Sequence, residues 1–306
     1  MTQKIKISKI CDHFNLKYFG YDVEIDRLGL CNRKTEYSSV LSYSTSDNYT
    51  SDVEWNSSIT CLIISEKYVK AYSEKVLGRK ISFIISDEPE IMFYLIHEWL
   101  SKNNLLYEKY SFPPKIGIDT NISETAIIEN GVIIGNRVSI GHNTVIKTGT
   151  IIDDDVTIGC NTTIGSEGFQ LITDGLKCPM HITHVGKCHI SSNVYIGDNS
   201  CVCNSLFEGE TFIGNGVKID NLVHVAHNLY IEKNAVIAAH SILCGSSYIE
   251  EGAWIAPNVS IINRVVVGKY SKVGLGSVVT KDVPPYTVVY GNPAREHFKK
   301  ENNDGK

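Results

Sequence analysis

The sequence predicts a mainly β protein, in which a parallel β-helix of about eight coils follows a small N-terminal α/β domain. Three observations lead to this prediction. Aliphatic residues recur every six positions from Ile116 onward, residues 1–112 lack that period, and Pro113-Pro114 separates the two regions. Adjacent prolines interrupt regular structure, so the pair marks the predicted domain boundary.

The six-residue repeat covers most of the chain. It places Ile, Val or Leu at two dozen positions in three phased runs, from Ile116 to Ile164, from Ile190 to Val202 and from Ile213 to Val279. A period of six matches neither a helix nor a single strand. It fits a coil of three short strands, with one hexapeptide per side and the aliphatic side chain inside. Three hexapeptides make a coil of 18 residues, and glycine relaxes the turn in pairs such as Ile134-Gly135.

The period breaks twice, and both breaks predict segments that lie outside the coil. The first break, between Ile164 and Ile190, contains residues 166–187. The second break is shorter and lies between Val202 and Ile213. Loops that leave a rigid solenoid often carry function. We therefore expect the loop 166–187 to wall a binding cleft of a neighbouring subunit.

The remaining elements follow from local patterns. Capping and hydrophobic periodicity predict helices at 6–15, 66–77 and 87–103, and apolar runs predict strands at 40–43, 61–65 and 81–85. The predicted domains are a small α/β domain that binds a nucleotide base at 1–112, the coil at 113–283 with the ejected loop 166–187, and a short polar tail at 284–306.

Composition excludes several classes of protein. The chain is 42% hydrophobic and 21% charged, which is too apolar and too mixed in charge for disorder. The net charge of −5 argues against a nucleic-acid-binding surface. No apolar run approaches the roughly 18–20 residues of a membrane span, and no secretory signal is evident, so we expect a cytoplasmic protein.

Cysteine spacing predicts free thiols and no metal site. The chain has nine cysteines, an odd number, and lacks a C-x-x-C motif. Reduced thiols that act as small apolar fillers are the expected state. His184 and His189 are five residues apart and could share a metal, but no third ligand lies in phase with them.

The segment Leu222–Asn228 is the best candidate for chemistry. His227 follows the inward Val225 by two positions, and the residues one and two coils later are Gly245 and Asn263. Residues one coil apart stack in a row, about 4.8 Å per coil. Histidine suits a general base, and a glycine N–H beside it suits an oxyanion, so the pair fits acyl transfer. The alternative is a surface histidine near a subunit contact.

The chain resembles the UDP-3-O-acylglucosamine N-acyltransferases of lipid A synthesis. The resemblance rests on the order of a small α/β domain and a hexapeptide coil, and on the segments Gly165–Phe169, Asn215–Asn221 and Val225–Asn228. It covers nearly the whole chain and is most specific from Ile158 to Gly245. The hexapeptide-repeat family implies a left-handed coil and a homotrimer whose active sites lie in clefts between neighbouring coils.

The same resemblance implies roles for individual residues. His227, in the A-H-N motif, is the implied catalytic base, and Gly245 supplies the oxyanion N–H. Tyr43 and Tyr49 have the spacing of two aromatic residues that sandwich the nucleotide base, although ordinary packing explains them equally well. The residues expected to position the sugar or the acyl donor are His224, Asn228 and Asn263.

Three departures from the family pattern change the expected substrates. Cys203-Asn204-Ser205 replaces the family's D-R-G, Arg264 replaces a second histidine, and the C-terminal helices that meet acyl carrier protein are missing. The ending instead resembles coenzyme A-dependent sugar acetyltransferases, which predicts acyl-CoA as the donor. The residues expected to hold its pantetheine and phosphates, each also explicable as an ordinary surface position, are Lys269, Gly276, Lys281 and Arg295.

These expectations combine into one predicted function. The protein is expected to move an acyl group from acyl-CoA to the amine of a dTDP- or UDP-linked amino-deoxy sugar for surface polysaccharides such as O-antigen. The first alternative is the acyl carrier protein-dependent enzyme of lipid A and lipopolysaccharide synthesis. Alternatives of other classes are a γ-type carbonic anhydrase, with three histidines on zinc, and a non-catalytic scaffold. The acyl length, the sugar and the choice of base stay open.

Overall fold

The computed structural model describes residues 4–299, apart from 33, 34, 36, 77, 108, 109, 174–177 and 208. The chain divides into two compact units, and each is described by itself. The small unit comprises Met1–Lys109 and Gln170–Val185, and the coil unit comprises Tyr110–Phe169 and Gly186–Lys306. None of the helices within the described ranges is both long enough and apolar enough to cross a membrane.

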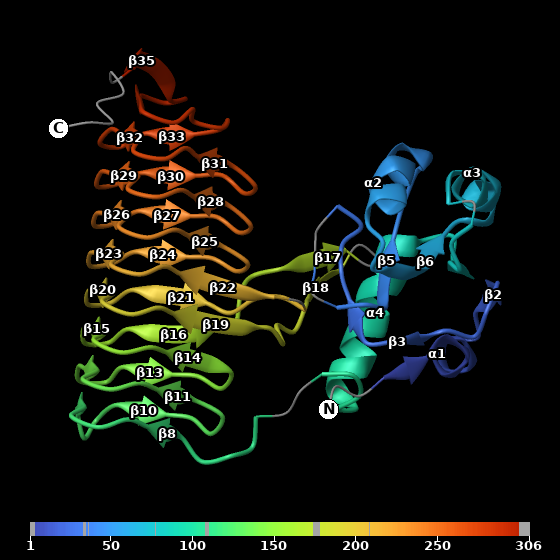
Figure 1. Cartoon of the computed structure of the whole chain (residues 1–306), viewed down its shortest axis with the longest axis horizontal. Helices are drawn as coiled ribbons and strands as arrows, with labels where there is room; N and C mark the ends of the chain where they lie inside the picture. The colour runs from blue at the N-terminus through green and yellow to red at the C-terminus, as the bar shows by residue number, and fades with distance from the viewer. Residues whose placement is uncertain are drawn as a thin grey trace. The chain divides into compact units, whose positions relative to one another are not determined.

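A five-stranded sheet forms the centre of the small unit (Figure 1). The strand order is β2 (Lys17–Phe19), β7 (Ser82–Ile85), β6 (Ile59–Ile64), β5 (Val40–Tyr43) and β4 (Arg27–Leu28). Strand β2 pairs with β7 in the antiparallel sense, and the other pairs are parallel. Central parallel strands are covered on both faces, which explains why every residue of β6 from Cys61 to Ile64 is 0% exposed.

Helices connect these strands. They are α1 (Ile7–Phe14), α2 (Thr50–Trp55), α3 (Val69–Lys75) and α4 (Pro89–Lys102), with 3₁₀ turns η1 (Asp47–Tyr49) and η2 (Glu66–Tyr68). A short ribbon pairs β1 (Ile5–Lys6) with β3 (Glu24–Ile25). The expected helices and strands are confirmed within a few residues, although Glu88 rather than Asp87 is the N-cap of α4.

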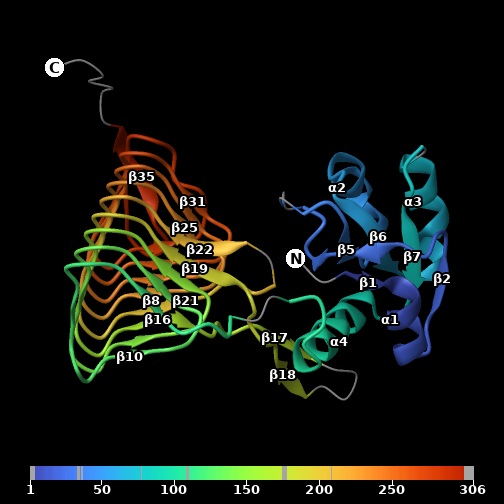
Figure 2. The same ribbon diagram turned by 60° about the horizontal axis from the view of Figure 1, so that its bottom comes forward.

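The coil unit is a left-handed parallel β-helix with three flat sides (Figure 2). The first side consists of β10 (Ile127–Ile128), β13 (Val145–Ile146), β16 (Thr163–Ser166), β21 (Cys201–Cys203), β24 (His224–Val225), β27 (Ile242–Leu243), β30 (Ser260–Ile261) and β33 (Val278–Val279). The second side consists of β8 (Lys115–Ile116), β11 (Ile133–Ile134), β14 (Thr150–Ile152), β19 (Lys187–Ile190), β22 (Glu210–Ile213), β25 (Tyr230–Ile231), β28 (Tyr248–Ile249) and β31 (Val266–Val267).

The third side is the longest. Its strands are β9 (Asn121–Ile122), β12 (Ser139–Ile140), β15 (Thr157–Ile158), β20 (Tyr195–Ile196), β23 (Lys218–Ile219), β26 (Val236–Ile237), β29 (Trp254–Ile255), β32 (Lys272–Val273), β34 (Thr287–Tyr290) and β35 (Arg295–Lys299). All pairs within it are parallel until β35, which turns back antiparallel on β34.

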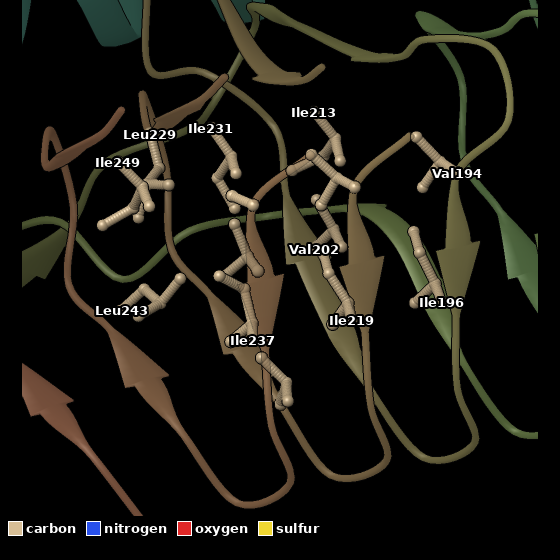
Figure 3. Close-up of a cluster of buried hydrophobic side chains, with 14 of the residues drawn as sticks. Val194, Ile196, Val202, Ile213, Ile219, Leu229, Ile231, Ile237, Leu243 and Ile249 are labelled. Carbon is tan, nitrogen blue, oxygen red and sulfur yellow. The ribbon is translucent and has the colours of Figure 1, made fainter. Parts of the chain in front are cut away.

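The aliphatic repeat forms the core of the coil, as the sequence predicts. Every repeat position from Ile134 to Val279 is 3% exposed or less. Their side chains meet inside the three sides, where Ile219 and Ile237 lie in successive coils (Figure 3). Ile116 starts the coil and is 48% exposed, because no earlier layer covers it. The interior is therefore a continuous apolar stack that sets the register of every coil.

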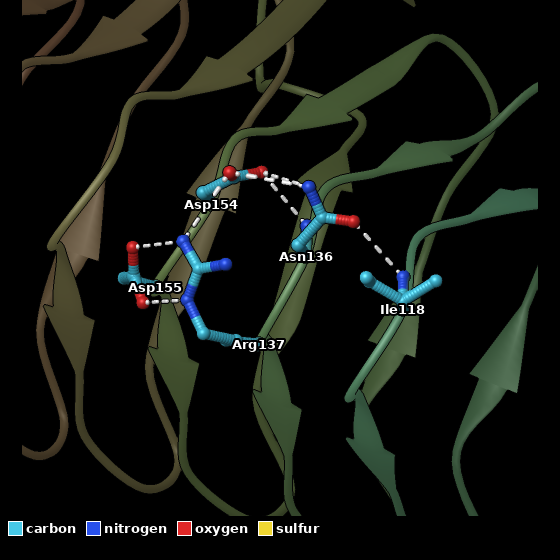
Figure 4. A network of polar contacts seen from close by, with 5 residues as sticks. All are labelled: Ile118, Asn136, Arg137, Asp154 and Asp155. Atoms are coloured by element: carbon cyan, nitrogen blue, oxygen red, sulfur yellow. Dashed lines mark hydrogen bonds and ion pairs between the residues drawn. The ribbon is translucent and has the colours of Figure 1, made fainter.

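Polar side chains link successive coils at the corners. Asp154 accepts a hydrogen bond from the Asn136 backbone N–H at 2.8 Å, and Asn136 accepts one from the Ile118 N–H at 2.9 Å (Figure 4). The Arg137 guanidinium donates to both carboxylate oxygens of Asp155, at 2.6 and 2.7 Å. The Arg137 hydrogen bond lowers the pKa of the Asp155 carboxyl. This acidic turn is thus an exposed, paired corner rather than a binding site.

Both breaks in the repeat leave the coil at the same corner, between the first and second sides. One excursion joins β16 to β19, and the other joins β21 to β22 one coil later. The first contains a hairpin of β17 (Leu171–Thr173) and β18 (Pro179–His181). Two successive coils therefore carry insertions at one edge of the molecule.

The hairpin segment packs within the small unit, against α4. The buried His97 ring places Nε2 2.7 Å from the Thr183 carbonyl oxygen, and burial lowers the pKa of that histidine. Glu98 accepts hydrogen bonds from the Thr183 backbone N–H at 2.6 Å and from its hydroxyl at 3.1 Å. The ejected loop thus has a partner in its own chain, which the sequence analysis did not anticipate.

The end of the chain is more ordered than expected. We expected residues 284–306 to be a polar tail, but Thr287–Tyr290 continues the third side as β34 and pairs with β32. Pro284-Pro285 interrupts the six-residue step and so hides this strand from the periodicity. Within the described residues, the ordered structure extends through β35.

Replacing a core residue tests whether the stacked interior sets the stability of the coil. Ile237 is 0% exposed, so Ile237→Ala should lower the free energy of unfolding by about 2–5 kcal/mol, because it leaves a cavity. Chemical denaturation followed by circular dichroism measures the change. Val236→Ala, its half-buried outward neighbour, is the control and should cost under about 1 kcal/mol. Equal losses in the two variants would contradict a core that depends on inward positions.

Candidate active site

His227, Gly245 and Asn263 lie in one row at the corner that carries the two insertions. Each belongs to a turn that follows a strand of the first side, β24, β27 or β30. Backbone hydrogen bonds connect these turns: the Ser246 N–H donates to the His227 carbonyl at 3.0 Å, and the Arg264 N–H donates to the Gly245 carbonyl at 3.2 Å. The structure therefore brings His227 and Gly245 together as the 18-residue spacing predicts.

Gly245 lies directly against the imidazole of His227. A Cβ atom at Gly245 would lie 2.7 Å from Nε2 and 2.8 Å from Cε1 of that ring. Glycine is required here because the His227 ring leaves no room for a side chain, and not because the backbone adopts a strained conformation. Among the described residues, the Gly245 carbonyl accepts a hydrogen bond, whereas the Gly245 N–H has no acceptor. A donor free to bind an anion thus lies beside the histidine.

Asn228 orients the His227 ring. Its Oδ1 lies 3.0 Å from His227 Nδ1 and also accepts a hydrogen bond from the Leu206 N–H at 3.0 Å, while its Nδ2 donates to Ser205 Oγ at 2.6 Å. Because the amide oxygen can only accept, Nδ1 is the donor in this contact. The half-buried imidazole therefore directs its Nε2 edge toward Gly245.

The second insertion supplies the partners of Asn228, and sequence reasoning missed them. Ser205 is 0% exposed and Leu206 is 6% exposed, so this short segment is buried rather than solvated. Thr211 accepts a hydrogen bond from the Asn228 backbone N–H at 2.9 Å. Asn228 has a φ of 57°, a left-handed conformation that asparagine tolerates better than most residues. The eleven-residue gap in the repeat was the signal for this segment.

A cluster of two thiols and an imidazole lies on the first side, on strand β21 and on strand β24, which precedes His227. Cys201 pairs with His224 across β21 and β24, and Cys203 lies two residues further along β21. Their sulfur and ring nitrogen atoms all lie within 4.8 Å of one another. The hydrogen bond from the Cys203 thiol lowers the pKa of Cys201 and raises that of Cys203, and His224 and Ser166 lower the Cys201 pKa further.

The two tyrosines of the expected base sandwich are not stacked on each other. The Tyr43 ring packs on Phe93, with centroids 4.9 Å apart, and its hydroxyl donates to Glu90 at 3.0 Å. Tyr49 lies on η1 and is 42% exposed. Tyr43 is thus held by α4, whereas Tyr49 is available to a ligand.

A pocket of about 260 Å³ lies near Tyr43, at the carboxyl ends of the parallel strands β5, β6 and β7. Its lining includes Thr45 after β5, Ser65 after β6 and Pro89 at the start of α4. Ligands of open α/β sheets bind at this edge. This pocket is formed by residues that sequence reasoning passed over.

The residues expected to hold the acyl donor are dispersed over the last coils. The Lys269 ammonium lies over the rings of Tyr270 and Tyr286, at 5.5 and 5.8 Å, and its backbone N–H donates to Glu250. The other three, all exposed or half-buried, are Gly276, Lys281 and Arg295. In the described part of the chain, no hydrogen bond or ion pair joins these four residues to one another. Asn263, one coil after Gly245, is exposed.

Comparison with known proteins shows what the coil is similar to. Residues 210–245 match the family model described as bacterial transferase hexapeptide (six repeats). A UDP-3-O-acylglucosamine N-acyltransferase of a Caulobacter species is 35% identical over 43% of this chain and 38% of its own length. The chain thus matches less than half the length of the first curated relatives. A Campylobacter lari protein of the same name is 29% identical over 94% of this chain and 93% of its own length.

Solved structures agree on the fold. A UDP-N-acetylglucosamine acyltransferase from Bacteroides fragilis matches 63% of this chain and 72% of its own, with a TM-score of 0.54 and 25% identity. The Campylobacter jejuni enzyme of that name matches 61% of this chain and 70% of its own, at a TM-score of 0.54 and 21% identity. The chain carries hexapeptide repeats of the bacterial transferase type and is similar to UDP-3-O-acylglucosamine N-acyltransferases.

A double-mutant cycle tests the contact between Gly245 and His227. Gly245→Ala should lower the free energy of unfolding by about 1–3 kcal/mol, because the new methyl group overlaps the ring. The same substitution in a His227→Ala background should cost much less, since the ring is gone. Denaturant titration of the four proteins measures the coupling. An equal cost in both backgrounds would refute the close packing of this pair.

Proposed function

We propose that the protein is an N-acyltransferase that moves an acyl group from a thioester to the amine of a UDP-linked amino sugar. The observation that carries the proposal is the placement of the His227 imidazole, with Nε2 facing Gly245, beside the Gly245 N–H. A base and an oxyanion donor in one row are the minimum that acyl transfer to an amine requires. The name of the Campylobacter lari relative, which matches over 93% of its own length, supports the same reaction.

The chemistry follows from these two residues. The amine nitrogen attacks the thioester carbonyl carbon and forms the new C–N bond, while His227 Nε2 removes a proton from it. The tetrahedral oxyanion accepts a hydrogen bond from the Gly245 N–H. Collapse breaks the C–S bond, and the departing thiolate takes the proton back from the imidazolium. Asn228 is a positioning residue, since its Oδ1 lies 3.0 Å from His227 Nδ1 and so fixes the orientation of the ring.

The relatives favour a different acceptor from the one that the sequence analysis placed first. Their names give UDP-3-O-acylglucosamine, which is the acceptor of the lipid A alternative, rather than a dTDP sugar. We therefore propose a UDP-linked glucosamine derivative as the first acceptor to test. His224 and Asn263 flank the reactive pair and remain proposed sugar-binding residues.

The nucleotide has a proposed place in the small unit. The pocket near Tyr43 lies where parallel sheets bind ligands, and Tyr49 exposes its ring close by in sequence. We propose that the uracil base binds there and stacks on Tyr49. Tyr43 acts indirectly, because its hydroxyl donates a hydrogen bond to Glu90, which lines the pocket.

The acyl donor is either acyl-CoA, as predicted, or an acyl carrier protein. Both present the same pantetheine thioester to His227, so the base and the oxyanion donor serve either one. The proposed coenzyme A contacts are Lys269, Gly276, Lys281 and Arg295, and only the three charged side chains would neutralise its phosphates. We also propose that the protein is a homotrimer, as the resemblance implies.

Substrate panels test the proposal directly. Thiol release is measured with short and long acyl-CoA, and with acyl carrier protein thioesters, against UDP- and dTDP-linked amino sugars. Transfer from acyl carrier protein to UDP-3-O-acylglucosamine would support the lipid A alternative, whereas transfer from acyl-CoA to another amino sugar would support the first prediction. Absence of turnover with every pair would refute an acyltransferase and favour the scaffold alternative.

Replacing the base gives a sharper test. His227→Ala should reduce turnover by about 10²–10⁴-fold without changing the fold, because proton removal from the amine is lost. His240→Asn is the matched control, since His240 lies in a turn of another corner with a φ of 59° that asparagine accepts. Steady-state kinetics on both variants measure the effect. Turnover of the His227→Ala protein at the control's rate would exclude His227 as the base.

A further inference from the structure

We propose that Cys201, Cys203 and His224 form a binding site for one zinc ion, next to the proposed base but separate from it. The inference does not depend on the proposed acyl transfer, because it rests on the placement of these three side chains alone. The sequence analysis expected no metal, and it assigned the cysteines to apolar filling. The structure instead places two sulfurs and an imidazole nitrogen within 4.8 Å of one another.

The coil fixes this arrangement through two simple rules. Side chains alternate along a strand, so Val202 points inward with 0% exposure while Cys201 and Cys203 lie on the opposite side of β21. Parallel pairing then sets His224 of β24 beside Cys201. The three ligands therefore come from two rigid neighbouring strands, which is the kind of support that a metal site requires.

The distances suit zinc. Tetrahedral zinc lies about 2.3 Å from thiolate sulfur and about 2.0 Å from imidazole nitrogen, so its ligand atoms lie roughly 3.5–3.8 Å apart. Ligand atoms that already lie within 4.8 Å of one another need to approach by about 1 Å. Thiolate and imidazole ligands select zinc over magnesium or calcium, which prefer oxygen.

The surroundings leave room for a fourth ligand and a path for the ion. Cys203 is 2% exposed and anchors the cluster, while Cys201 is half-buried and His224 is exposed. The Ser166 hydroxyl on the neighbouring strand β16 hydrogen-bonds to Cys201. A water molecule can complete a tetrahedral site, as in zinc sites with three protein ligands.

The buried cysteines of the small unit are examples of thiols that only fill apolar space. Cys11, Cys31 and Cys61 are buried in the small unit, where burial raises the pKa of each thiol and no histidine completes a ligand set among the described residues. The cluster differs because three soft ligands face one point. A zinc ion there would join β21 to β24, immediately before the turn that carries His227.

Metal binding to the untagged, reduced protein tests the site. The chelator-treated chain is titrated with zinc against a colorimetric competitor, and cobalt substitution is followed through its thiolate charge-transfer absorbance. We expect one ion per chain and a cobalt spectrum with sulfur ligands. Cys201→Ser, Cys203→Ser and His224→Gln should each lose this one-to-one binding, and His224→Gln, at an exposed position, should keep the native circular dichroism spectrum.

Cys160→Ser is the matched control, since Cys160 is a half-buried thiol of the coil outside the cluster. It should bind zinc as the parent protein does. Failure of the reduced parent to bind zinc stoichiometrically would overturn the proposal, and so would unchanged binding in all three ligand variants. Suppose that the purified protein contains a Cys201–Cys203 disulfide and that the protein still binds no zinc after this disulfide is reduced. That result would assign the cluster to redox chemistry instead. Acyl transfer is not needed for any of these readouts.

Discussion

The stacking of inward aliphatic side chains is the constraint on which the rest of the structure depends. Each layer, such as Ile219 under Ile237, fixes the height and rotation of the next coil. Parallel backbone pairing transmits the same register along all three sides. Outward residues at the corners do not have to fill the core, so they can be polar. The row of His227 and Gly245 exists because the core beneath it holds two successive turns in line.

Much of the coil could be predicted by counting, because its contacts recur at one fixed spacing. That spacing correctly brings Gly245 to His227, and the structure adds the reason for the glycine in the overlap that a Cβ would make with the ring. The 18-residue spacing could not predict any of the contacts that cross the second insertion. Five additional residues separate Cys201 from its partner His224, and the same offset separates Ser205 from Asn228. Both pairs were invisible to an 18-residue rule.

The small unit illustrates a different limit. Its parallel strands were predictable from their apolar runs, whereas the packing of Tyr43 against α4 was not. An aromatic residue at a strand end fits both a ligand contact and ordinary packing, and here Phe93 and Glu90 of α4 hold it. Nothing local in the sequence marks α4 as that partner. The hairpin that leaves the coil is a similar case, because Thr183 meets Glu98 far away in sequence.

The corner between the first and second sides has a consequence for how such a chain can be altered. Both insertions leave and re-enter there, yet β19 and β22 pair in the register that β14 and β25 continue. Chain length at this edge is thus decoupled from the distance between the reactive residues. Segments of other lengths and compositions can therefore be exchanged at the first of these turns without rebuilding the coil, whereas the second must keep Ser205 and Leu206, which hold Asn228.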